Sequence, residues 1–116
     1  MSDVIDSEQI SMLVEGAGVD GVRPILDAYW QSNDNLIEQI GAAIKAGDGT
    51  ALSAAAHGLK GSSANLGATV VAERARAIEV AAKDGDMAAA QSSFDHLDAD
   101  IANVREAFEA ILAAAG

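Results

Sequence analysis

Apolar residues recur at helical spacing along almost the whole chain, and only short segments that contain glycine interrupt this pattern. The longest stripe consists of Val22, Ile25, Leu26, Tyr29, Leu36, Ile37, Ile40, Ala43 and Ile44. Because glycine is common just beyond helix ends, Gly47 and Gly85 mark such ends, and Gly67 with Ala68 forms a tight turn. Short connections make successive helices antiparallel neighbours. The sequence therefore predicts an all-α protein, an up-and-down antiparallel four-helix bundle with a short additional N-terminal helix.

Capping residues indicate where the individual helices begin. Asp6, with Gln9 three residues later, resembles a capping box for a short first helix that ends at Gly16. Pro24 is expected in the first turn of the next helix, where no intrahelical N–H is needed. The remaining helices are expected at about residues 50–66, with Asp48 or Thr50 as the cap, at about 69–83, and from about 86 onward.

The composition supports helices and narrows the possible partners. The 116 residues suit one domain, residues 1–116, and half of them are hydrophobic, largely alanine, with 3% aromatic residues and one proline. The net charge is −11 and the pI is near 4.2. This charge argues against a nucleic acid or an anionic membrane as partner, since both bind clustered lysine and arginine.

The sequence also lacks several kinds of segment and site. It has no cysteine, and therefore neither a disulfide framework nor a thiolate metal site. No apolar run approaches the roughly 18 residues that a membrane span needs. The acidic start, residues 1–6, does not resemble a signal peptide, so the expected location is the cytoplasm.

One segment stands out from the helical pattern: His57-Gly58-Leu59-Lys60-Gly61-Ser62-Ser63-Ala64-Asn65-Leu66-Gly67. On a helix, His57, Lys60 and Gly61 share one face. The opposite, apolar stripe consists of Leu52, Ala56, Leu59, Ser63 and Leu66. A glycine within a helix costs about 0.5–1 kcal/mol relative to alanine, so Gly61 suggests close approach of another molecule. Ala54 and Ala64 are also small, and they extend this surface of small side chains. The sequence therefore predicts an exposed histidine that a large partner can reach.

The pattern His57-x-x-Lys60-Gly61-Ser62-Ser63-x-x-Leu66-Gly67, in a helix that follows a long amphipathic one, resembles the histidine-containing phosphotransfer (HPt) domains of multistep two-component phosphorelays. The resemblance implies a phosphoryl carrier without catalytic machinery of its own. His57 would accept a phosphoryl group from the aspartate of one receiver domain and pass it to another. The implied partners are receiver domains of response regulators or of a hybrid histidine kinase, which bring Mg²⁺. The domain itself would be a monomer without cofactor or metal.

Two residues are expected to support His57. Lys60, one turn along the helix, can place its ammonium near the phosphoryl oxygens. Residues equidistant from a hairpin turn come level, so a turn centred at Ala68 pairs His57 with Glu79. The Glu79 carboxylate can accept a hydrogen bond from one ring nitrogen and leave the other free to attack. In the resembling family this position often holds Gln or Glu. The alternative is that Glu79 is an ordinary surface charge beside the core stripe.

Two other functions stay open at this point. One is a helical protein-interaction module in which His57 is incidental. The other is a kinase-linked phosphoacceptor domain of the chemotaxis-kinase type, which takes its phosphate from an ATP-binding kinase domain.

The other polar patterns carry less information. His96 is expected to be a solvated residue on a polar face with Asp95, Asp98 and Asp100, and these carboxylates lack the spacing of a calcium-binding loop. Ser63 is expected to bond to a carbonyl of the preceding helical turn. The glycines at 16, 18 and 21 have the spacing of a dinucleotide-binding fingerprint. That motif requires a preceding strand, however, and here a helical pattern precedes the glycines.

Overall fold

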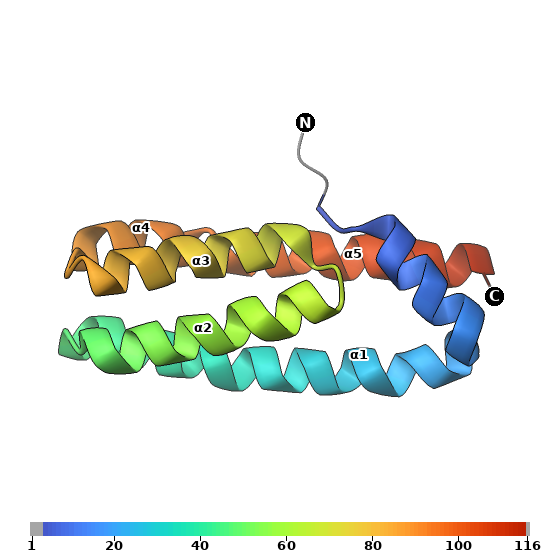
Figure 1. Ribbon diagram of the computed structural model, residues 1–116, viewed down its shortest axis with the longest axis horizontal. Coiled ribbons are helices and arrows are strands. Elements are labelled where there is room, and N and C mark those ends of the chain that lie inside the picture. Colours follow the sequence, from blue (N-terminus) through green and yellow to red (C-terminus); the bar gives the residue numbers. More distant parts are fainter. Residues whose placement is uncertain (1–3, 116) are drawn as a thin grey trace.

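The computed structural model describes residues 4–115, which form helices and no strand. The helices are α1 (Ser7–Ala46), α2 (Gly49–Asn65), α3 (Thr69–Lys83), α4 (Met87–Asp95) and α5 (Leu97–Ala115). The long part of α1, then α2, α3 and the α4–α5 pair run side by side along the longest dimension of the molecule (Figure 1). The predicted all-α, up-and-down four-helix bundle is confirmed.

Helix α1 is broken near its start at Gly18, whose φ of 77° and ψ of 163° are not helical. The short N-terminal helix therefore ends at Ala17, one residue beyond the predicted end at Gly16. In Figure 1 it crosses the end of the bundle before α1 turns into its long part. Because the break is at Gly18, Pro24 lies beyond the first turn of the long part, and its predicted place in that turn is wrong. Proline lacks the N–H that would bond the carbonyl of Asp20 at this position.

The N-terminal segment is tied to the connection between α2 and α3. The backbone N–H of Asp6 donates to the carbonyl of Gly67 at 2.7 Å, and that of Val70 donates to the carbonyl of Val4 at 3.1 Å. The side-chain amide of Gln9 donates to the carbonyl of Asn65 at 2.6 Å. The predicted capping box is half formed: Asp6 accepts from the N–H of Gln9. The Gln9 side chain instead satisfies carbonyls at the end of α2, which lack partners within their own helix.

Most of the other predicted helix ends are confirmed. Gly47 follows α1 with a φ of 69°, and the carboxylate of Asp48 accepts from the N–H of Ala51 at the start of α2. Asp86 caps α4 in the same way. The single last helix expected from about residue 86 is wrong, since the structure divides it at His96 into α4 and α5. The chain stays close to a helical conformation at this joint (φ −90°, ψ −10°), so apolar periodicity continues across it.

The core lies between the bundle helices and includes Val22, Leu26, Ile40, Leu52, Leu59, Val71, Ile78, Leu97, Val104 and Phe108. The inner face of α2 is the predicted stripe, although Leu66 is only half-buried.

Ser63 does not bond to the preceding turn. Its hydroxyl is 2.6 Å from the hydroxyl of Tyr29 on α1, and Ser62 makes the expected bond instead, to the carbonyl of Leu59. Ser63 is fully buried against α1, where Tyr29 can reach it.

Candidate functional site

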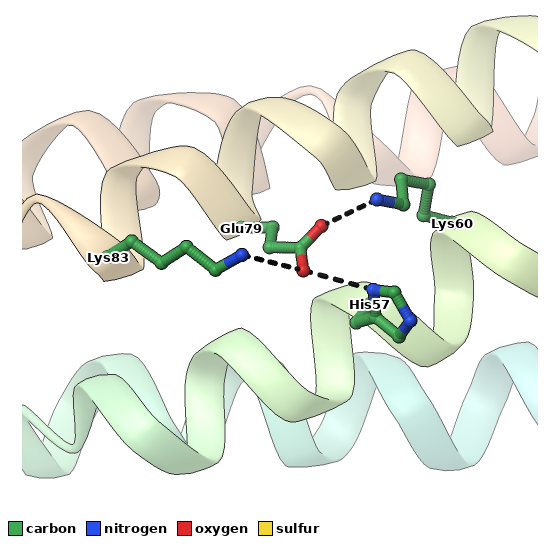
Figure 2. Close-up of polar contacts among 4 residues, drawn as sticks. All are labelled: His57, Lys60, Glu79 and Lys83. Carbon is green, nitrogen blue, oxygen red and sulfur yellow. Dashed lines mark hydrogen bonds and ion pairs between the residues drawn. The ribbon is translucent and has the colours of Figure 1, made fainter.

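The candidate site lies on the hairpin of α2 and α3, and the tight turn at Gly67 sets its register. Gly67 has a φ of 75°. A Cβ atom at this position would lie 3.1 Å from the carbonyl oxygen of Asp6, so glycine is required both by the backbone and by the neighbouring segment. The turn brings His57 on α2 level with Glu79 on α3 (Figure 2).

His57 presents one nitrogen to the protein and the other to solvent. Its Nδ1 lies 3.0 Å from Oε2 of Glu79, and its side chain is 69% exposed. Figure 2 shows the second ring nitrogen, Nε2, pointing away from Glu79. A neutral imidazole has one N–H and one lone pair. The carboxylate therefore selects the tautomer in which Nδ1 donates and Nε2 carries the free lone pair.

Glu79 is a buried carboxylate and not the exposed surface charge that was the alternative. Its side chain is 8% exposed. One oxygen accepts from Nζ of Lys60 at 2.8 Å, and Nζ of Lys83 lies 3.5 Å from the other. The hydrogen bond from Lys60 is the main cause that lowers the pKa of Glu79 to about 2. The bond from His57 and the charges of both lysines add to this effect, which exceeds the opposing effect of burial.

The positions of the two lysines differ from the sequence-based expectation in one respect. Lys60 was expected to point toward a phosphoryl group on His57, whereas its ammonium is engaged with Glu79 beside the ring (Figure 2). The structure adds Lys83, which the sequence analysis did not single out. The spacing of Glu79 and Lys83, four residues apart on a helix, is the signal that could have identified it.

The surface around His57 has little relief. A Cβ atom on Gly61 would meet nothing within 4 Å, and Ala54 and Ala64 are exposed. Beside the histidine, a shallow groove between α2 and α3 is lined by residues that include Ser53, Ala54, Ala82 and Lys83. A glycine that faces open space has no internal packing role, so the structure leaves room for another molecule at this position.

Comparison with known proteins identifies the family. The Hpt domain family matches residues 24–107 of the sequence. The chain belongs to the Hpt domain family. The crystal structure of histidine-containing phosphotransfer protein B from Pseudomonas aeruginosa PAO1 is similar, with a TM-score of 0.85, 28% sequence identity and 94% of each chain covered. A search of curated proteins gave no match. The chain is thus a phosphocarrier module with a role in histidine phosphotransfer within a phosphorelay, and domains of this family interact with receiver domains.

The second histidine of this Hpt domain has different surroundings. His96 is exposed at the joint of α4 and α5, and its backbone N–H donates to the carbonyl of Ser93. Within residues 4–115 its ring has no side-chain partner. In the same range, no group of three or more His, Asp or Glu side chains is arranged to hold a metal ion. No helix of the described chain has the length and apolar character to cross a membrane.

Proposed function

We propose that His57 is the residue that carries the phosphoryl group, and that it exchanges this group with aspartates of receiver domains in response regulators or in a hybrid histidine kinase. The observation that carries the proposal is the arrangement of the ring. Nδ1 is held by a buried carboxylate, while Nε2 is exposed beside a glycine with open space above it.

The proposed chemistry follows from this arrangement. The lone pair on Nε2 attacks the phosphorus of the acyl phosphate on the receiver. An N–P bond forms while the bond between phosphorus and the aspartate oxygen breaks, and the electron pair leaves with the carboxylate. The proton on Nδ1 stays in its hydrogen bond to Glu79. Transfer to a second receiver is the same step in reverse.

Glu79 and the lysines have positioning roles in this proposal. After transfer the ring holds a proton on Nδ1 and phosphorus on Nε2, so it is positively charged. The carboxylate of Glu79, kept ionised by Lys60, compensates that charge. Phosphoryl transfer depends mainly on positioning and on charge stabilisation. Both lysine side chains contact the carboxylate that holds the ring, and through it they contribute to both (Figure 2).

The decisive test is to mix the purified protein with a phosphorylated receiver domain and to measure the phosphate bound to the protein. We expect a label that is labile in acid and stable in base, as a phosphoramidate is, and that maps to the peptide containing His57. If no receiver from the same genome transfers phosphate, the protein is better described as an interaction module. If an ATP-loaded kinase domain lacking any receiver labels it efficiently and receivers do not, it is a kinase-linked phosphoacceptor domain.

A further inference from the structure

One position on the inward face of α1 holds a polar residue where the helical spacing calls for an apolar one. The buried side chains of the long part of α1 follow one another at steps of three, four or seven positions, and Asn33 belongs to this series. The others in the series are Val22, Leu26, Tyr29, Ile40 and Ala43. Asn33 is 1% exposed, so its amide lies in the interior of the bundle.

Two hydroxyl groups lie near this amide. Tyr29 is one turn before Asn33 on α1, and its hydroxyl is 2.6 Å from that of the fully buried Ser63 on α2, the neighbouring helix (Figure 1). Burial raises the pKa of the Tyr29 hydroxyl, and the nearby side chains of Ser63 and Asn33 oppose this rise. The three side chains therefore form a polar layer in the core between α1 and α2.

The polar layer can make more hydrogen bonds than its own side chains provide. Within residues 4–115, neither Oδ1 nor Nδ2 of Asn33 lies in hydrogen-bond geometry with another protein group. The contact between Tyr29 and Ser63 uses only one of their two O–H groups. Buried polar groups are nearly always bonded either to protein or to ordered water, because an unpaired one has lost its hydration without replacement.

We propose that the polar layer is a binding site for an ordered internal water molecule, which links Asn33 on α1 to the hydroxyl pair of Tyr29 and Ser63. The water accepts a hydrogen bond from the second O–H of the pair and donates one to Oδ1 of Asn33. The N–H groups of the same amide donate to the remaining lone pairs of the hydroxyls or of the water. An internal water makes about three hydrogen bonds to buried polar groups, and the two hydroxyls and the amide offer enough partners for this.

Water fits this layer better than an ion does. Asn33, Tyr29 and Ser63 are all uncharged, so an ion among them would be buried without an opposite charge, which is costly. A neutral molecule that both donates and accepts satisfies the amide and the hydroxyls together. The water would join α1 to α2 on the buried face of α2, whereas His57 lies on its exposed face. The inference therefore does not depend on the function proposed above.

The test compares Asn33→Leu with Asn35→Leu, the same substitution at an exposed asparagine two positions along α1. Magnetic relaxation dispersion of water oxygen-17 counts long-lived internal waters in solution, and high-resolution crystal structures locate them. In the wild type we expect a water oxygen at about 2.7–3.2 Å from an amide atom of Asn33. Asn33→Leu should remove one long-lived water from the count, and Asn35→Leu should remove none.

A second pair of variants keeps the test decisive if Asn33→Leu does not fold, which thermal unfolding reports. Ser63→Ala removes one hydroxyl of the layer and should lower the count in the same way. Ser62→Ala should not, because the Ser62 hydroxyl bonds to the carbonyl of Leu59 within α2. A wild-type crystal structure in which the Asn33 amide bonds directly to protein, with no water beside it, would overturn the proposal. A count that is the same in the wild type and in folded Asn33→Leu would also overturn it.

Discussion

The two histidines of this chain make an informative comparison, because both are exposed, His57 within α2 and His96 at the joint of two helices. His57 lies on the hairpin, with Nδ1 3.0 Å from a carboxylate that is almost fully buried and with Gly61 one turn away. His96 lies at the joint between α4 and α5, and within the described residues its ring has no side-chain hydrogen bond or ion pair. Exposure is common to both, so it cannot be what distinguishes a phosphoacceptor site.

The difference lies in what is fixed around each ring. At His57, the buried Glu79 fixes the tautomer and the ring orientation, and lysines on both helices keep that carboxylate charged. At His96, within residues 4–115, no side-chain hydrogen bond or ion pair holds the ring. A nucleophile that must meet a phosphorus atom in line gains from being held in one geometry. In the proposed function, the buried partner therefore matters as much as the exposed histidine.

The largest expected effect on phosphate transfer comes from replacing each histidine in turn with glutamine. His57→Gln should reduce phosphate uptake from a phosphorylated receiver to background, because the nucleophilic nitrogen is lost. His96→Gln should transfer at the wild-type rate. Both should melt within a few degrees of the wild type, since exposed side chains contribute little to stability. Rapid-quench labelling and thermal unfolding check these outcomes, and phosphate found on His96 would reverse the assignment.

The next effect concerns the open space beside His57. Gly61→Gln should lower transfer from a receiver at least tenfold, because the new side chain occupies the space into which the receiver must fit. Gly61→Ala should stabilise the fold by about 0.5–1 kcal/mol, as alanine does at an exposed helical position with ordinary backbone angles.

Denaturant unfolding and transfer kinetics, measured on the same proteins, separate the two roles. Strong destabilisation by Gly61→Gln would show that the glycine is needed for internal packing. A normal transfer rate in that variant would place the docking surface elsewhere.

A smaller loss is expected from the residues that hold the ring. Glu79→Ala should slow transfer about tenfold by releasing Nδ1, and Lys60→Ala should slow it about threefold or shorten the lifetime of the phosphohistidine. Glu73→Ala is the matched control, since Glu73 is an exposed glutamate on the same helix. If the Glu79 and Lys60 variants transfer as fast as this control, both positioning roles are wrong, although the role of His57 stands.

The smallest effect is a dependence of stability on pH. The pKa of Glu79 is lowered from 4.5 to about 2 in the folded state, so its stabilising contribution is fully present above pH 4.5. The contribution is lost as the pH falls from about 4.5 to 2, and it amounts to at most about 3 kcal/mol. Denaturant unfolding of the wild type and of Glu79→Gln across this range should converge toward low pH. A constant difference between the two proteins would contradict the lowered pKa.

The sequence predicted the features that depend on local spacing. Helix type, most helix ends and the outward position of His57 follow from apolar periodicity and capping residues. The pairing of His57 with Glu79 followed from counting along α2 and α3, because both helices are regular from the turn to these residues.

Other features could not be predicted because they depend on contacts between distant segments. Ser63 on α2 bonds to Tyr29 on α1, and Gln9 reaches the end of α2 and leaves the predicted capping box half formed. The depth at which Glu79 is buried depends on how closely the helices approach. The joint at His96 was missed for a different reason, since a near-helical residue leaves the apolar pattern unbroken.

The break at Gly18 has a consequence for the way in which the molecule assembles. The residues that meet at the site are close in sequence, since His57 and Glu79 are 22 positions apart, whereas Gln9 and Asn65 are 56 positions apart. Contacts between nearby residues form faster than contacts that close a long loop. The hairpin can therefore fold early, and the N-terminal segment, which precedes the break at Gly18, is expected to dock later onto the Gly67 turn. In this order of folding, the pair of His57 and Glu79 would form before the N-terminal segment docks.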